Sequence, residues 1–259
     1  MKALVLNLAD AGERLSFISE QLKLLSMAWD RIEAVSPHAL EPSAEDPVWQ
    51  RWERPLRTTE MATCASHMIA WAHVFNSGEP HLVLEDDAML DKATPKLLEM
   101  LEDSESGFDH VSLETALRKK LLALNKHPDL PVKRMYLDRT GAAAYALWPS
   151  GATKLLARAC RARGLADGII CAASELNSWQ ADPALAVQLN NLKTQHIVPM
   201  TAASSQITAE AKPQRGGIYF RARRIRSQAT QGLRQLRPGA RLQRVDFSGD
   251  WVINPLRPS

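Results

Sequence analysis

Three consecutive acidic residues, Glu85, Asp86 and Asp87, directly follow a short apolar run at residues 81–84. Side chains alternate along an extended segment, so Glu85 and Asp87 should point to one side and Asp86 to the other. Crowded carboxylates repel one another unless a cation joins them, and their hard oxygen atoms suit Mg²⁺ or Mn²⁺, which in turn could hold a diphosphate. A solvated acidic turn would have the same sequence, so the spacing alone leaves both interpretations open.

The beginning of the chain predicts the sheet that would position this triplet. Residues 3–8 form a nearly continuous apolar run, as expected of a strand buried on both faces. Residues 13–25 carry apolar side chains at helical spacing, and residues 29–35 return to a strand-like pattern. Ligands bind beyond the carboxyl ends of strands in open α/β sheets, and the triplet lies at such an end. We therefore expect an α/β fold with a mostly parallel central sheet flanked by helices.

The rest of the chain alternates predicted loops, helices and strands. Four prolines make residues 36–57 a long surface loop. A helix capped by Thr58 or Thr59 should run to Gly78. Its inner face would carry the apolar residues Met61, Cys64, Met68, Trp71 and Phe75. Further elements are predicted as helices at 95–103 and 151–163, the second capped by Ser150, and as strands at 108–113, 142–148 and 195–198.

The composition is that of an ordinary soluble globular protein, with 259 residues, 45% hydrophobic and 24% charged. Three cysteines without a CxxC pair argue against a disulfide framework and a zinc module. His67 and His73 do not share a helix face, so they form no metal pair, and we expect His67 in the core. Asn7 and Asp10 interrupt the apolar opening too early for a signal peptide, and no apolar run approaches the roughly 20 residues of a spanning helix. We expect a cytosolic protein.

The last fifth of the chain is strongly basic. From residue 211 onward, eleven basic residues face two acidic ones, a net charge of +9, which leaves −6 on residues 1–210 because the total is +3. Arginines mixed with Ile225, Leu233, Leu236 and Leu242 suit a helix resting on anionic headgroups. Nucleic-acid binding is less expected, because aromatic residues interleave only at residues 219–220. A solvated extension is the third interpretation.

Several sequence blocks, in the same order, resemble glycosyltransferase family 25, which includes lipooligosaccharide galactosyltransferases. The opening VLNL at 5–8, followed by Glu13 and Arg14, is similar to the family's first strand and helix start. The central block is TEMATCASHMIAW at 59–71, with Gly78 and then LVLEDD at 82–87. GAAAY at 141–145, with GA at 151–152 and LL at 155–156, is similar to a later strand and helix. The resemblance spans about residues 3–200 and does not extend to residues 205–259.

The resemblance implies a GT-A type fold over residues 1–205, with residues 206–259 as a basic C-terminal extension. It also implies a nucleotide-sugar donor, most plausibly UDP-galactose, and Mn²⁺ or Mg²⁺ held through the Glu-Asp-Asp motif. In that arrangement Asp87 would be the direct metal ligand, Asp86 would bind the donor ribose or share the ion, and Glu85 would orient the pair. The remaining contacts to the nucleotide sugar would come from Asn7, Leu8 and Arg14.

Transfer with inversion needs one base to take the proton of the acceptor hydroxyl. Asp167, in the Ala-Asp-Gly loop after the predicted 151–163 helix, is the first candidate, because the resemblance places a family aspartate in that loop. Glu114, at the end of the predicted 108–113 strand, is the second and is expected to line the site. A helix-capping Asp167 is the structural alternative.

We expect from this a hexosyltransferase that acts on a lipooligosaccharide or related glycan at the cytosolic face of the inner membrane. The expected partners are the donor, a glycolipid or oligosaccharide acceptor, and an anionic membrane surface that the tail contacts, with no nucleic acid. Residues 9–12 and 199–202 depart from the family pattern and leave the donor open. A metal-dependent phosphoesterase, or a binding protein without turnover, are the alternatives.

Overall fold

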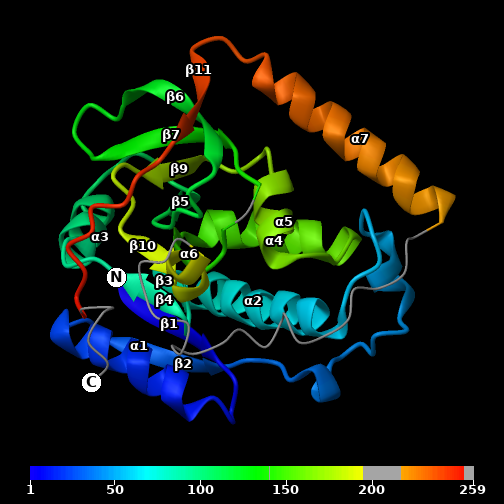
Figure 1. Cartoon of the computed structure of the whole chain (residues 1–259), viewed down its shortest axis with the longest axis horizontal. Coiled ribbons are helices and arrows are strands. Elements are labelled where there is room, and N and C mark those ends of the chain that lie inside the picture. The colour runs from blue at the N-terminus through cyan, green and yellow to red at the C-terminus, as the bar shows by residue number, and fades with distance from the viewer. Residues whose placement is uncertain (140, 195–216, 254–259) are drawn as a thin grey trace.

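The computed structural model describes residues 1–139, 141–194 and 217–253. Within these residues, nine strands form one sheet in the order β11-β6-β7-β9-β5-β8-β3-β1-β2, and β10 pairs with β4 in a small second sheet (Figure 1). The strands are β1 (Lys2–Asn7), β2 (Trp29–Glu33), β3 (His81–Glu85), β4 (Ala88–Leu90), β5 (His110–Ser112), β6 (Lys119–Lys126), β7 (Val132–Leu137), β8 (Ala144–Leu147), β9 (Ser178–Ala181), β10 (Ala186–Gln188) and β11 (Ala240–Arg244). The helices are α1 (Gly12–Leu24), α2 (Thr58–Ser77), α3 (Thr94–Glu102), α4 (Pro149–Arg161), α5 (Ala166–Ala172), α6 (Leu189–Thr194) and α7 (Ile218–Gln235).

The chain is α/β, as predicted, but the expectation of a mostly parallel sheet is wrong. Strand β1 pairs in parallel with β2 and β3, which is the predicted strand-helix-strand opening. Of the eight pairings in the described part of the large sheet, three are parallel and five antiparallel. Only a short connection joins β6 to β7, which enforces antiparallel pairing, and β8 inserts antiparallel between β3 and β5.

Helices cover both faces of the sheet, so the fold has three layers. Leu4 and Leu6 of β1 face a core that contains α2, α4 and α5. Their neighbours Ala3 and Val5 face a second core, which contains α1 and α3. Alternation along a buried strand thus divides β1 between two apolar layers, and the carboxyl end of β1 is held firmly beside that of β3.

Helix α2 follows the prediction in length, while its start and its last turn differ. Neither threonine is the N-cap; Arg57 is, and the Glu60 side chain accepts its backbone N–H at 2.9 Å. Gly78 ends the helix in the left-handed conformation with φ +70°. Phe75, predicted to face inward, is 51% exposed, because Val74, three residues after Trp71, takes the buried position in the last turn.

Two other predicted features differ in detail. The loop at 36–57 contains two short 3₁₀ helices, η1 (Pro37–Ala39) and η2 (Pro47–Arg51), and Trp49 is 1% exposed within the α2 core. Trp148, not Ser150, is the N-cap of α4. The Ser150 hydroxyl donates instead to Asp109 Oδ1 at 2.6 Å.

The loop at 36–57 belongs to the packed body, because its Trp49 is buried in the core that contains α2.

The basic C-terminal part contacts the body along α7, where Arg234 donates to the carbonyls of Cys171 and Ala172, and again beyond this helix. The predicted strand at 195–198 and the boundary after residue 205 lie outside the described residues. Strand β11 pairs antiparallel with β6 at the edge of the sheet, and the chain then runs back across the molecule towards α1 (Figure 1). There Phe247 and Trp251 pack with Phe17 and Met89. Of the helices within the described ranges, none combines the length and apolarity needed to cross a bilayer.

Candidate active site

The acidic triplet lies where β3 ends beside β1. The register pairs Leu6 of β1 with Glu85 of β3, so the next residue of each strand also falls close together. The side chain of Asn7 is buried, and its Nδ2 donates to Asp86 Oδ2 at 2.7 Å and to the carbonyl of Ala11 at 3.0 Å. Arg14, in the first turns of α1, places a guanidinium nitrogen 3.0 Å from Asp86 Oδ1. Both oxygens of Asp86 are therefore held by β1 and α1.

The other two acids turn towards Gln188 of β10. The Gln188 amide donates to Glu85 Oε2 at 2.9 Å, and a hydrogen bond from the same side chain to Asp87 favours the ionised form of that carboxyl. The predicted alternation is thus present, with Asp86 directed to Asn7 and Arg14 and its two neighbours directed to Gln188. Oδ1 of Asp87 is buried and has no hydrogen-bond partner among the described residues.

Burial and mutual repulsion raise the pKa of two of these acids. Burial is the larger cause for Glu85, followed by the charges of Asp167 and Asp86, and its pKa is about 7. For Asp87 burial again comes first, followed by Glu85 and Asp86, and its pKa is also about 7. Near neutral pH both carboxyls are partly protonated, so a cation that binds between them can displace their protons.

His67 of α2 connects the triplet to the helix core. Its Nε2 lies 3.2 Å from Glu85 Oε1, and its Nδ1 lies 2.9 Å from the Tyr145 hydroxyl, which accepts the indole N–H of Trp71 at 2.7 Å. Burial lowers the pKa of His67 to about 4, so the ring is neutral. When Glu85 is ionised it can only accept, so the ring proton is then on Nε2 and Nδ1 accepts from the Tyr145 hydroxyl. The predicted buried position of His67 is confirmed, and the residue also orients Glu85.

Two cavities meet at the triplet. The first, here the triplet cavity, has a volume of about 120 Å³ and is lined by the three acids together with Leu8, Arg14, Thr63, His67 and Gln188, among others. The second, here the Asp167 cavity, has about 320 Å³ and is lined by Glu114, Asp167, Arg118 and Asn191, among others. Thr63, Glu85 and Gln188 line both. The sequence-predicted residues therefore line two neighbouring cavities, except Asn7, which is buried and bonds to Asp86.

The two candidate bases occupy different environments in the Asp167 cavity. Asp167 is in the first turn of α5, and its Oδ1 accepts the backbone N–H of Gly168 at 2.6 Å. Its pKa is raised, mainly by burial. Glu114 is more deeply buried, accepts the backbone N–H of Ala143 at 2.8 Å through Oε2, and has a pKa raised by burial to about 8. Burial therefore raises the pKa of both carboxyls above the ordinary carboxyl value.

The donor atoms of the triplet fit a divalent ion shared with a bound phosphate. In the described ranges, no three or more His, Cys, Asp or Glu side chains are arranged to hold a metal on their own. Mg²⁺, however, commonly uses one or two carboxylates and completes its shell with water and substrate phosphates. Asp87 offers a buried oxygen without a partner in the described part of the chain, beside a second carboxylate, Glu85. Asp86, held by Asn7 and Arg14, is less available than the sequence suggested.

Sequence reasoning missed three residues that shape the site. Gln188 is about a hundred residues from the triplet, and no local pattern marks it. Gln21 is buried in α1 and fixes β4 directly after the triplet, since its amide donates to the carbonyl of Ala88 at 3.0 Å and accepts the N–H of Leu90 at 2.8 Å. Tyr145 belongs to the GAAAY segment at 141–145, which predicted a strand but no role for the tyrosine hydroxyl. Of the three, only Gln21 could have been noticed from the sequence, because it is a polar residue within the apolar face of a predicted helix.

Three solved structures show low similarity to this one. The inositol-1-phosphate CTP transferase of T. maritima has 10% identity and a TM-score of 0.38, covering 76% of this chain and 73% of that one. A Drosophila beta-1,4-galactosyltransferase 7 variant, in complex with manganese, UDP-Gal and xylobiose, has 10% identity and a TM-score of 0.37, covering 83% and 82%. A protein of Thermus thermophilus described as a mannose-1-phosphate geranyltransferase has 14% identity and a TM-score of 0.33, covering 71% and 58%. At these scores the similarities carry no argument about function.

The sequence itself gives a clearer match. No curated protein matches it significantly. The family described as "Glycosyltransferase family 25 (LPS biosynthesis protein)" matches residues 1–170. That range contains β1, the acidic triplet, Glu114 and Asp167, and it ends before Gln188 and α7.

Proposed function

Because the chain belongs to glycosyltransferase family 25, we propose that it transfers a hexose from a nucleotide sugar to a glycan acceptor, with a GT-A type arrangement of the donor site. The observation that carries this proposal is the pair of cavities that share Thr63, Glu85 and Gln188. The triplet cavity is lined by acids that could hold a divalent ion and by Arg14, which could contact the phosphates of a nucleoside diphosphate. The other is lined by two carboxyls suited to proton transfer, so donor and acceptor can meet at the shared wall.

In this proposal the triplet cavity binds the nucleoside diphosphate part of the donor. Asn7 and Leu8 lie at the end of β1 and would contact the nucleoside, while Arg14 offers positive charge to the phosphates. Asp87, with Asp86 as second ligand or ribose contact, would hold Mn²⁺ or Mg²⁺. The ion would supply charge neutralisation for the departing diphosphate. Glu85, fixed by His67 and Gln188, keeps the two aspartates in position.

The acceptor binds in the Asp167 cavity. The acceptor hydroxyl oxygen forms a bond to the anomeric carbon from the side opposite the diphosphate, the bond from that carbon to the diphosphate oxygen breaks, and the configuration inverts. Asp167 takes the hydroxyl proton, and its raised pKa makes it a competent base. Glu114 lines the cavity beside it and, with a pKa of about 8, is largely protonated at neutral pH and available to donate a hydrogen bond to the acceptor.

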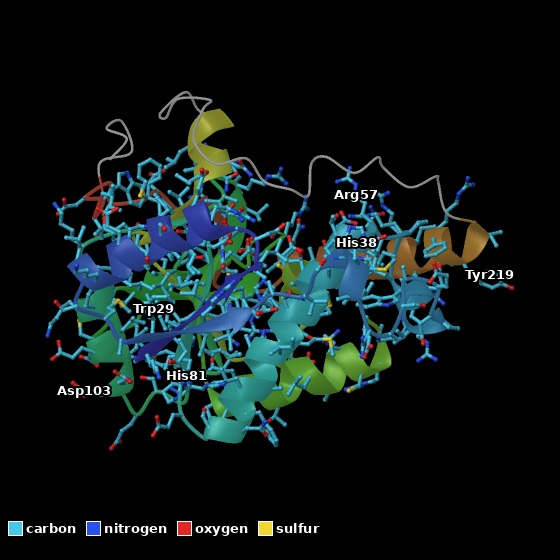
Figure 2. All side chains as sticks on the ribbon, turned by 90° about the horizontal axis from the view of Figure 1, so that it is seen from below. Trp29, His38, Arg57, His81, Asp103 and Tyr219 are labelled. Carbon is cyan, nitrogen blue, oxygen red and sulfur yellow. The ribbon has the colours of Figure 1, made fainter. Side chains whose placement is uncertain are left out.

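We propose UDP-galactose as donor and a lipooligosaccharide or related glycolipid as acceptor, on the family resemblance. The acceptor would be reached at the cytosolic face of the inner membrane, with the protein bound peripherally. Exposed apolar side chains of α7 support this placement, because Ile218, Tyr219 and Ile225 are exposed among arginines. Tyr219 is 78% exposed and points away from the body at the outer end of α7 (Figure 2).

A panel of nucleotide sugars tests the proposal. The full chain is incubated with each sugar, Mn²⁺ and a truncated lipooligosaccharide, and release of the nucleotide and mass gain of the acceptor are measured. One donor should support a mass gain of one hexose. Hydrolysis of phosphoesters without transfer would favour a phosphoesterase, and nucleotide binding without turnover would favour a binding protein.

A further inference from the structure

A third cavity, here the Arg237 cavity, lies between α7 and the sheet and has a volume of about 420 Å³. Its walls come from β5, β7, α5 and α7, including His110, Arg134, Tyr136, Thr230, Arg234 and Arg237. This volume is within the range of about 300–1,000 Å³ that is typical of small-molecule sites. Gly141 lines both this cavity and the Asp167 cavity, so the two spaces adjoin.

Two arginines of this cavity are paired only with neutral groups of the described residues. Arg134 donates to the carbonyls of Leu176 and Ser178, and Arg234 donates to those of Cys171 and Ala172. Within the described ranges, neither arginine is at ion-pair distance from a carboxylate. Their carbonyl contacts hold the guanidinium groups in place without neutralising the charge.

Arg237 is the third guanidinium group, and it lies over the ring of Tyr136 at 4.3 Å from the centroid. It too has no carboxylate at ion-pair distance within the described residues. The acid that lines the cavity, Asp138, is 2.6 Å from Lys120 Nζ and so is already matched by a cation. The positive charge around the cavity is therefore available to an anion that enters.

His110 supplies a second, independent indication of a ligand. It is 1% exposed and lines the cavity, and neither ring nitrogen has a hydrogen-bond partner among the described residues. Burial, with Lys120 as the next cause, lowers the pKa of His110 to about 3, so the ring is neutral. A neutral imidazole offers one donor and one acceptor, which is the pair that a hydroxyl group complements.

We propose that the Arg237 cavity binds an anionic sugar, a hydroxyl-bearing ring that carries a carboxylate or phosphate, as part of the acceptor. This inference rests on the proposed transferase function, because the adjoining Asp167 cavity would hold the sugar that receives the hexose. Gly141 keeps the junction open. A Cβ there would come within 3.3 Å of Glu114 Oε2, and the φ of +129° disfavours any other residue. The C-terminal helix would thus contribute to acceptor selection.

Binding of simple anionic sugars to the full chain, without donor or metal, tests this inference. Glucuronic acid and glucose 6-phosphate are the carboxylate and phosphate probes, and glucose is the neutral control, each followed by calorimetric titration. At least one anionic sugar should bind about tenfold or more tightly than glucose, as expected for charge-assisted hydrogen bonds. Comparison of the two probes identifies the acidic group.

Two variants locate the binding. Arg237→Gln should weaken it about tenfold, whereas Arg241→Gln, which removes the same charge from an exposed position of β11 outside this cavity, should leave it unchanged. Thr230→Trp keeps all three arginines and fills the cavity from its outer wall, so it should abolish binding. Unchanged melting temperatures show that these variants remain folded.

Failure of this inference can be told apart from failure of the proposed function. If UDP binds with Mn²⁺ but anionic sugars bind no better than glucose, or if Arg237→Gln and Thr230→Trp bind them as the wild type does, the anionic-sugar site is overturned and the transferase proposal stands. If anionic sugars bind as expected while no nucleotide sugar supports transfer, the cavity binds its ligand but the role in acceptor selection is overturned.

Discussion

Asn7 at the end of β1 donates a hydrogen bond to Asp86 just after β3, with 2.7 Å between Nδ2 and Oδ2. This bond joins two segments that are 79 residues apart, and Arg14 completes it from the other side at 3.0 Å. Asp86 is therefore fixed by protein groups, whereas Asp87 keeps a buried oxygen without a partner among the described residues. The two neighbouring aspartates thus differ: Asp86 is a fixed part of the wall of the triplet cavity, and Asp87 offers this buried oxygen to a ligand.

Asn7→Ala should weaken Mn²⁺-dependent UDP binding by about tenfold, because a hydrogen bond to a charged group contributes about 1.5–3 kcal/mol. Without it, Asp86 is held by Arg14 alone and loses its fixed position in the wall of the triplet cavity. Calorimetric titration of UDP in the presence of Mn²⁺ measures the loss. Ser19→Ala, which removes an exposed helix hydroxyl, is the control. Equal affinity in wild type and Asn7→Ala would separate Asp86 from nucleotide binding.

The metal-free protein should lose stability as pH rises from about 6.5 to 8. The folded-state pKa values of Glu85 and Asp87 are about 7 and that of Glu114 is about 8, all above the roughly 4 of unfolded carboxyls. In this window the folded state binds more protons than the unfolded state, so the free energy of unfolding falls as the pH rises. Buried His67 does not offset the loss, because its lowered pKa affects stability only below about 6.5.

Melting temperature measured across this pH window checks the prediction. Added Mn²⁺ should raise the melting temperature more at pH 8 than at pH 6.5, because the ion competes with the same protons. Asp87→Asn should flatten the pH profile, since it removes one titrating group and its repulsion on Glu85. A melting temperature that stays level or rises through this window would contradict the raised pKa values, because carboxyls already ionised in the folded protein add no pH dependence here.

How far the sequence predicted the fold depends on how local the signals are. The elements around the triplet, β1, α1, α2 and β3, lie within one or two residues of their predicted ranges, because continuous apolar runs and Gly78 mark them. Strands β6 and β7 were not predicted because exposed and buried positions mix irregularly along them, and only three residues of β7 are buried. The sheet's antiparallel half was therefore not foreseen.

The site shows the same division. Glu85, Asp86 and Asp87 are adjacent in the sequence, so their meeting could be predicted. Gln188 reaches Glu85 only because β10 pairs with β4, a long-range contact that no local pattern reveals.

Asp167→Asn should leave UDP binding intact and lower turnover by roughly 10² to 10⁴ fold, the usual effect of losing a general base. The amide keeps the shape of the side chain but cannot take the acceptor proton. Steady-state rates with the active donor and acceptor measure the effect, and UDP titration measures binding. Normal turnover in Asp167→Asn combined with a large loss in Glu114→Gln would move the base to Glu114.

The intact protein should bind anionic vesicles through α7, and Arg221→Gln combined with Arg226→Gln should weaken this binding. Each basic residue near a charged surface contributes about 1 kcal/mol, so the double variant should lose roughly tenfold or more at low salt. Co-sedimentation with phosphatidylserine vesicles measures it, with Lys23→Gln and Lys119→Gln as the control pair outside α7. Binding should also fall as salt shortens the Debye length below about 8 Å. If nucleic acid is bound at the same salt while vesicles are not, the membrane assignment fails.

The most direct test of the donor site is UDP binding by Asp87→Asn, titrated with and without Mn²⁺ beside the wild type and an exposed control, Asp129→Asn. Asp87 contributes a buried oxygen to the triplet cavity, and its replacement removes repulsion between buried acids without removing an apolar contact. Wild type and Asp129→Asn should bind UDP tightly only with Mn²⁺. Asp87→Asn should lose most of that metal-dependent affinity while its melting temperature stays equal or rises. Equal UDP affinity in wild type and Asp87→Asn, or UDP affinity in the wild type that is indifferent to Mn²⁺, would rule out a metal-dependent donor site at Asp87.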